Sequence, residues 1–461
     1  RKPLSEVVTY VGCDCENAPL IVVSGMNTYP MVSGVGTEDE KVVFPPEIDI
    51  PSLALTAVNG IAQALLTQSW DKLADVLLPA VSEILEPVAC DENGDSKYPI
   101  TVEKFPLSVA NYPDIGELNP SYNEFALIHE GIDRYGADHV YFYSYNWRED
   151  PLVHAKEIRE LVETAKKDSG HDKVILAPCS MGGVQVLAYL ALYGSEDIET
   201  LAFLSSTAFG TYLPSDLFNK KILLDKDLLM LFLQGQLAED AMGEFLRLVM
   251  DGLDKLGLVQ SLLDFVNQGV DEIIDRVYDE LLQDIFMTMP GLWALIHPTD
   301  EYESAKQALD PIKYEKLIER IDDFHYNVAE NRDEILTAAE KSGTKIIVFS
   351  HYGTVGVPLY EHGVLENDGI LETTCTSGGA VTANIGQTLP EGYRQKNTEC
   401  GHNHLSADGI IDASTCFFPE YTWFFKYVRH VGVGYGGDQA EFLFKLFAYD
   451  GQPTVHSPGL Y

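Results

Sequence analysis

The feature that most constrains the fold is a regular alternation of short apolar runs with helical segments. The runs are rich in β-branched and aromatic residues, and Gly, Pro or polar residues bound them. Strands that alternate with helices of about 10–15 residues predict a parallel sheet with helices on both faces. The expected strands are residues 19–25, 139–145, 173–177 and 200–204, and the expected helices are residues 123–135, 153–167 and 183–193.

Two stretches break this alternation. Residues 31 to about 120 are mixed, with a helix expected near Leu53–Leu85 and a turn at Asp91–Gly94, and we interpret them as an insertion. Residues from about 211 to 341 have apolar positions at three- and four-residue steps, which predicts helices. This helical stretch is either an ordinary subdomain that packs on the sheet or a cap over a functional site.

The strand-and-helix pattern resumes after the helical stretch, with strands expected at 344–349 and 421–428 and a helix at 439–448. The predicted fold class is therefore α/β, with a mostly parallel central sheet. The predicted organisation is a core whose first part is 1–210, a helical cap at 211–340, and a second part of the core at 341–461.

Composition excludes several classes of partner. The chain has 31 Lys and Arg against 71 Asp and Glu, a formal net charge of −40. Binding to phosphates needs clustered Lys and Arg, so a nucleic-acid partner and purely electrostatic docking on anionic lipid are both disfavoured. Since no run of about 18 apolar residues occurs, no transmembrane helix is expected. The acidic composition favours an extracellular or cell-envelope location.

Ser180 is the most informative residue for function. It follows the expected strand 173–177 in Pro178-Cys179-Ser180-Met181-Gly182-Gly183 and directly precedes an apolar helix. A serine on a sharp strand-to-helix turn is typical of a nucleophile elbow in α/β-hydrolases, where small neighbours let the strand and helix approach closely. Gly182 meets that requirement, whereas Pro178 replaces the small residue expected on the other side.

A serine nucleophile needs a base and an acid, which follow it along the chain in the order Ser, acid, His. His430 comes directly after the last expected strand, where a general base should lie. His351 and His362 are alternatives that spacing alone does not remove. For the acid, Asp368 and Asp408 both lie in Asp-Gly turns followed by two apolar residues.

The oxyanion that forms during acyl transfer needs backbone N–H donors. One is expected from Met181, the residue after the nucleophile, and the other from Met26 or Asn27 in the loop after the first strand.

Several of these segments resemble the lecithin:cholesterol acyltransferase-related branch of α/β-hydrolases and the bacterial lipases near it. The most specific match is Tyr145-Asn146-Trp147-Arg148, which is similar to a Tyr-Asp-Trp-Arg motif of that branch, with Asn in place of Asp. The asparagine would remove an ion pair with Arg148. Other matches are Val23–Asn27, Ser180–Gly183, Thr207–Thr211, Pro290–Trp293 and Gly353–Pro358.

The resemblance also implies roles for individual residues. Glu366-Asn367-Asp368-Gly369-Ile370 is similar to the acid motif of bacterial lipases, which makes Asp368 the expected acid and Asp408 the reserve. It further implies a cap that moves and an apolar acyl pocket. Seven side chains could line that pocket, although most are expected to be core residues of the cap: Phe232, Leu233, Phe245, Leu248, Phe286, Leu292 and Trp293.

The segment Cys400-Gly401-His402-Asn403-His404 offers three potential zinc ligands. No fourth ligand stands at a standard spacing, so no metal is expected. A disulfide from Cys400 to Cys375 or Cys416 is the alternative. The seven cysteines are too few for a disulfide framework. No nucleotide-binding motif occurs, and no cofactor is expected.

These observations predict a serine hydrolase that cleaves carboxylic ester bonds of a lipid or other acylated substrate. Ser180, Asp368 and His430 would be catalytic, and the amides of Met26 and Met181 would stabilise the oxyanion. Two alternatives stay open: an acyltransferase that uses the same acyl-enzyme, and a non-catalytic acidic surface or binding protein that retains the fold. The sequence does not indicate the oligomeric state.

Overall fold

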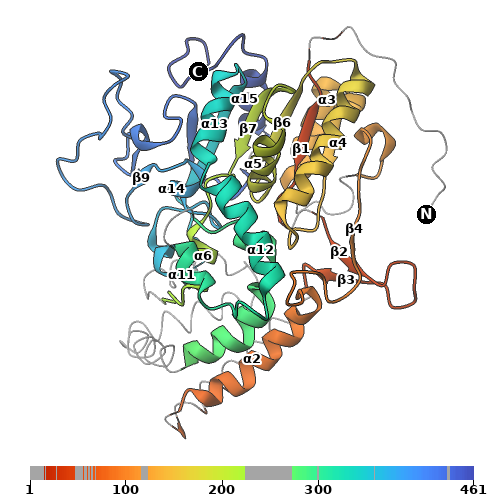
Figure 1. The fold of residues 1–461 in the computed structure, drawn as a ribbon. Coiled ribbons are helices and arrows are strands. Elements are labelled where there is room, and N and C mark those ends of the chain that lie inside the picture. Colours follow the sequence, from red (N-terminus) through yellow and green to blue (C-terminus); the bar gives the residue numbers. More distant parts are fainter. Residues whose placement is uncertain are drawn as a thin grey trace, which may run out of the picture.

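The computed structural model describes residue 15, residues 17–26, 29–46, 69–115, 123–223, 273–297, 301–357, 359–432 and 437–460, and a few positions between 56 and 67. A six-stranded sheet with the strand order β11-β8-β7-β6-β1-β5 forms its centre (Figure 1). Every neighbouring pair in it is parallel. Its strands are β1 (Leu20–Val23), β5 (Val140–Tyr143), β6 (Val174–Pro178), β7 (Ile198–Leu204), β8 (Lys345–Tyr352) and β11 (Thr422–Lys426).

Helices cover both faces of this sheet, as its continuous apolar strands require. The helices α4 (Pro151–Ser169), α5 (Gly182–Tyr193) and α13 (Arg332–Lys341) lie together on one face (Figure 1). On the other face, α3 (Asn123–Tyr135) meets α15 (Gly437–Phe447) through the rings of Tyr135 and Phe444, 5.3 Å apart. The prediction of an α/β fold on a mostly parallel sheet is confirmed, and the arrangement is consistent with an α/β-hydrolase.

The stretch interpreted as an insertion contains a small antiparallel sheet and one long helix. The sheet has the order β3-β2-β4, from Lys41–Phe44, Met31–Ser33 and Ile100–Val102. The helix α2 spans Asp71–Leu85 and forms the second part of the predicted helix. The described positions of the first part, 56, 60, 63, 66 and 67, are also helical, and a turn at Trp70 separates them from α2. The turn predicted at Asp91–Gly94 is confirmed, because the Gly94 amide donates to the Asp91 carbonyl.

Helix α2 does not pack on the central sheet but on the helical stretch. It runs beside η4 (Tyr278–Phe286) at the end of the molecule away from the sheet (Figure 1). Trp70 and Leu73 pack with Ile273, and Arg276 forms an ion pair with Asp75 at 2.9 Å. Part of the presumed insertion therefore belongs to the same packed layer as residues 273–286.

The remaining described helices of residues 211–341 are short. They are α6 (Tyr212–Phe218), α10 (Pro290–Trp293), α11 (Glu301–Lys306), α12 (Glu315–Phe324) and η5 (His325–Ala329). Residues 224–272 and 298–300 lie outside the described part, and with them Phe232, Leu233, Phe245 and Leu248. Leu292 and Trp293 are buried core residues, and the Trp293 ring contacts Phe218. A separate cap at 211–340 stays a prediction.

The strand β8 runs three residues beyond the predicted Phe349. Its extension contains Ser350 and His351, whose polar character ended the apolar run in the sequence. Both are buried, and each has a side-chain partner: Ser350 Oγ lies 2.7 Å from Thr376 Oγ1, and His351 Nδ1 lies 2.8 Å from Ser205 Oγ. The other secondary-structure elements are η1 (Glu86–Val88), η2 (Val109–Asn111), η3 (Ala137–His139), η6 (Glu361–Val364), α14 (Thr373–Thr376), β9 (Val381–Thr382), β10 (Ile411–Asp412) and η7 (Ala413–Thr415).

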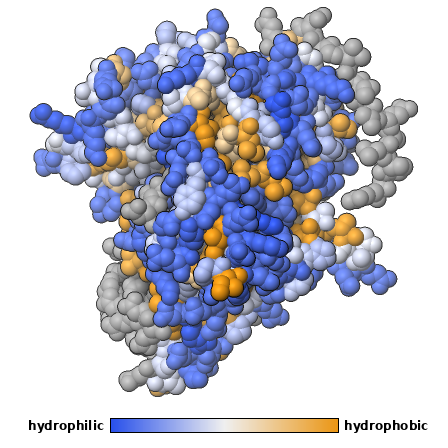
Figure 2. All heavy atoms as spheres, viewed as in Figure 1, coloured by the Kyte–Doolittle hydropathy of each residue, from blue (hydrophilic) through white to orange (hydrophobic). Residues whose placement is uncertain are grey.

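Blue hydrophilic residues dominate the face seen in Figure 2, as expected for a chain with so many carboxylates. In the part of the chain that the structure describes, every helix is too short or too polar to cross a membrane.

Candidate active site

Ser180 occupies a strained turn between β6 and α5. Its φ angle is +50°, a left-handed conformation that non-glycine residues rarely adopt. Backbone hydrogen bonds hold it there, because the Ser180 amide donates to Leu204 and the Thr207 amide donates to the Ser180 carbonyl, at 3.1 and 2.9 Å. This turn presents the Ser180 side chain at the carboxyl edge of the sheet.

Two glycines after the serine allow the turn to form. A Cβ atom on Gly182 would lie 2.6 Å from the carbonyl oxygen of Val23, and one on Gly183 would lie 2.6 Å from the backbone nitrogen of Ala208. Neither contact is sterically possible without displacing the neighbouring segment. The close approach of helix to sheet that the sequence suggested for Gly182 thus extends to Gly183.

Pro178 is accommodated by a gap in the sheet. The β6–β7 ladder ends at the Leu176–Leu201 pair and resumes with a bridge between Cys179 and Leu204. Pro178 lies in the interval, and because proline has no N–H it loses no ladder hydrogen bond there. The adjacent Cys179 amide still donates to Val23 at 2.9 Å. The elbow therefore forms despite the proline.

His430 and Asp368 reach Ser180 from the ends of β11 and β8. His430 Nε2 lies 2.7 Å from Ser180 Oγ, and His430 Nδ1 lies 2.8 Å from Asp368 Oδ2. The carboxylate fixes the tautomer with the proton on Nδ1, which leaves Nε2 free to accept the serine proton. In addition, the His430 backbone amide donates to the Asp368 carbonyl at 2.8 Å.

Asp368 is fully buried and remains ionised. Burial by itself would raise its pKa, but the charge of and hydrogen bond from His430, with the amides of Leu371 and Ile370, hold the pKa below its ordinary value. These two amides donate to Oδ1 at 2.8 and 3.0 Å, so Oδ2 is left for the imidazole. The carboxylate is thus fixed in position by its own turn.

The alternative acid Asp408 and the alternative bases His362 and His351 contact residues other than Ser180 and His430. Asp408 binds Lys426 Nζ at 2.9 Å and accepts the Tyr352 hydroxyl at 3.1 Å. His362 binds the buried Asp216. His351 is buried against Ser205, and burial lowers its pKa to about 4.

Ser205 is a residue that the sequence interpretation missed. Its Oγ accepts the amide of Val431 at 3.2 Å, next to His430, and also contacts His351. Ser205 itself has a φ angle of +44°. It therefore anchors the loop that carries His430. The sequence signal that could have found Ser205 is its position directly after β7, the strand that pairs with the elbow strand β6.

The two predicted oxyanion donors, Met26 and Met181, both lie at the elbow. Within the described residues, no acceptor binds the backbone N–H of Met26 or of Met181. Met181 is the N-cap of the twelve-residue helix α5, where the helix dipole adds positive potential. Met26 follows the end of β1, directly beside the elbow, since Gly182 packs against Val23 and Ser24. Asn27 lies outside the described residues.

The Tyr145–Arg148 segment braces this region. The Tyr145 hydroxyl donates to the Ser24 carbonyl at 3.0 Å, just before Met26. Arg148 is fully buried and donates to Asn146 Oδ1, to the Val88 carbonyl and to Ser96 Oγ, at 3.0, 2.8 and 2.7 Å. Asn146 in turn donates to Glu149 at 2.8 Å. Arg148 is thus held by neutral acceptors, as the asparagine implied.

The cysteines near the predicted disulfide are all free thiols. Cys375 and Cys416 are buried, and Cys400 is partly exposed. Neither forms the predicted alternative bridge with Cys400.

No family model matches the chain, and no curated protein sequence matches it. Among solved structures, a chain of the Tle4-Tli4 complex aligns with 94% of this chain and 98% of its own length, at 12% sequence identity and a TM-score of 0.33. A similarity at this level carries no functional conclusion, so the chemistry rests on the residues of the site.

Proposed function

We propose that this protein is a serine hydrolase that cleaves carboxylic ester bonds of lipid or other acylated substrates. The observation that carries the proposal is the continuous chain of hydrogen bonds from Ser180 through His430 to the buried Asp368. Two further features support it: the strained conformation of Ser180, and the amides of Met26 and Met181, which no acceptor among the described residues binds.

The proposed mechanism follows from these contacts. Ser180 Oγ attacks the acyl carbonyl while its proton passes to His430 Nε2. Asp368 stabilises the imidazolium, and the Met26 and Met181 amides stabilise the oxyanion. His430 then protonates the leaving alcohol, and a water molecule activated by the same imidazole releases the acyl group.

Labelling by a fluorophosphonate probe tests the proposal directly, because the probe traps only a serine activated by a base. Wild type should label, and Ser180→Ala should not. Ser304→Ala is the matched control, since Ser304 is an exposed serine on α11. Ester hydrolysis by Ser180→Ala should fall by about 10⁴–10⁶-fold.

Two results would contradict the proposal: no labelling of folded wild type, with or without detergent, or equal labelling of Ser180→Ala. The first would favour the non-catalytic alternative. If wild type labels, ester hydrolysis measured with and without an added alcohol separates a hydrolase from an acyltransferase, because transfer yields the new ester in place of the free acid.

A further inference from the structure

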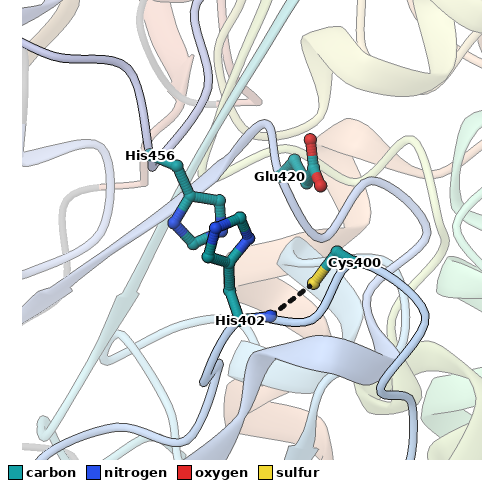
Figure 3. Close-up of side chains that lie close together, drawn as sticks. All are labelled: Cys400, His402, Glu420 and His456. Carbon is teal, nitrogen blue, oxygen red and sulfur yellow. Dashed lines mark hydrogen bonds between the residues drawn. The ribbon is translucent and has the colours of Figure 1, made fainter.

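Four potential metal ligands converge far from the triad, in the loops beside the C-terminal segment. They are Cys400, His402, Glu420 and His456, and one ligand atom from each lies within 4.8 Å of all the others. Figure 3 shows the imidazole rings of His402 and His456 face to face, with Cys400 and Glu420 to one side. Cys400 and His402 come from the segment in which the sequence showed three of the four ligands that zinc requires.

The set of donors matches zinc in chemistry, and its spacing is somewhat wider than a bound ion requires. Zinc takes thiolate, imidazole and carboxylate ligands in tetrahedral geometry, with bonds of about 2.0–2.3 Å. Such bonds place neighbouring donors roughly 3.3–3.8 Å apart, so the four side chains need to close by about an ångström. A thiolate with two imidazoles disfavours Ca²⁺ and Mg²⁺, which prefer oxygen ligands.

The surroundings of Cys400 support a ligated thiolate. The His402 backbone amide donates to Cys400 Sγ at 3.5 Å, and His404 Nε2 lies 2.9 Å from the same sulfur. His404 Nε2 is also 3.4 Å from His456 Nε2. Outer-shell groups of this kind orient the ligands of metal sites.

The backbone that carries the ligands is held in place. The Gln395 side chain accepts the His404 amide at 2.6 Å and donates to the His402 carbonyl at 3.0 Å. The Val455 amide donates to the Glu420 carbonyl at 2.8 Å, which brings His456 beside Glu420. Three segments distant in the sequence therefore meet at the cluster.

The approach to the cluster is electronegative. A cavity of about 490 Å³ opens beside Cys400 and His404, and Glu340, Glu399 and Glu420 line it. No lysine or arginine is among the described residues of its wall. Such a site attracts a divalent cation rather than an anion.

We propose that Cys400, His402, Glu420 and His456 bind one zinc ion, with His404 as an outer-shell partner of the thiolate. Four protein ligands leave no open coordination position, which assigns the site a structural role. The ion would fasten the C-terminal segment to the 395–405 loop. Binding replaces the Cys400 thiol proton, which is released to solvent.

Titration with Zn²⁺ and Co²⁺ under reducing conditions tests this proposal. The group Cys15, His139 and His171 also offers three donors, so the experiments use a Cys15→Ser background. In that background one equivalent of Zn²⁺ should bind with sub-micromolar affinity. Co²⁺ should give the absorption of a tetrahedral complex, with a thiolate charge-transfer band.

The variants Cys400→Ser and His456→Ala should each weaken zinc binding at least 100-fold, and Cys400→Ser should remove the charge-transfer band. His404→Ala should keep the band and weaken binding by about 10–100-fold. The matched control His129→Ala changes an exposed histidine on α3 and should bind as the background does.

A second measurement needs no ligand variant. In the Cys15→Ser background, zinc should protect Cys400 from alkylation by iodoacetamide, as mapped by mass spectrometry. Absence of a zinc equivalent, absence of the charge-transfer band, or equal alkylation of Cys400 with and without zinc would each overturn the proposal.

Discussion

The substitution Asn146→Asp restores the acidic residue of the resembled motif beside Arg148, and we expect it to destabilise the protein. Asn146 is nearly buried and bridges two charges, because its Oδ1 accepts from Arg148 Nε while its Nδ2 donates to Glu149. Aspartate can perform only the first task, since a carboxylate has no N–H.

The magnitude follows from three opposing effects. At an effective dielectric constant of about 20, a carboxylate 3.0 Å from Arg148 gains about 5 kcal/mol. Glu149 is 48% exposed and 2.8 Å away, so its better-screened repulsion returns about 3 kcal/mol. Desolvating the new carboxylate costs several kcal/mol and the lost amide hydrogen bond about 2 kcal/mol. The net expectation is a loss of about 2–4 kcal/mol at pH 7.

Urea unfolding of four proteins measures this effect: wild type, Asn146→Asp, Glu149→Gln and the double variant. In the double variant the introduced glutamine amide can donate to the introduced aspartate carboxylate, so most of the loss should disappear. The loss should also shrink as the pH falls from 7 to 5, because crowding raises the folded-state pKa of the carboxylate pair above its unfolded value. Stabilisation by Asn146→Asp at pH 7, or no recovery in the double variant, would refute the reasoning.

Three further predictions concern the catalytic region and pH. Asp368→Asn should lower kcat for ester hydrolysis about 10⁴-fold while Asp408→Asn lowers it less than about tenfold, and the reverse ranking would identify Asp408 as the acid. Gly183→Ala should abolish fluorophosphonate labelling and cost at least about 2 kcal/mol in urea unfolding, because its Cβ would lie 2.6 Å from the backbone nitrogen of Ala208; full labelling would contradict the clash. The hydrogen bond with Asp216 raises the pKa of His362 above its ordinary 6.5, so its contribution to stability is complete at acidic pH and is lost as the pH rises through that raised pKa. The difference in Tm between wild type and His362→Gln should therefore be largest below pH 6 and smallest above pH 8, and a constant difference would exclude this linkage.

The parallel sheet was predictable because apolar periodicity is a local signal. The convergence of Ser180, Asp368 and His430 followed from topology, since the carboxyl ends of parallel strands share one edge. The Asp-Gly pattern alone did not distinguish Asp368 from Asp408, and only the resemblance to the acid motif of bacterial lipases favoured Asp368. The structure separates them by their partners, the His430 imidazole for one and Lys426 for the other.

Contacts between distant segments were beyond the sequence. His456 lies 56 residues from Cys400, so no spacing rule for metal ligands would join them to Glu420. The packing of α2 on residues 273–286 depends on Trp70 and Leu73 meeting Ile273 across some 200 residues. Both are properties of the tertiary structure, which local patterns do not encode.

His430 is attached to Asp368 by two separate hydrogen bonds, one that positions its backbone and one that supports its role in proton transfer. The His430 amide is held by the Asp368 main-chain carbonyl, while the imidazole is held by the carboxylate. Truncation in Asp368→Ala removes only the second attachment and leaves a cavity of carboxylate size beside a correctly seated ring. Such a cavity has room for formate. Formate added to the solution should therefore restore part of the activity that the truncation removes, because it replaces the missing carboxylate beside His430.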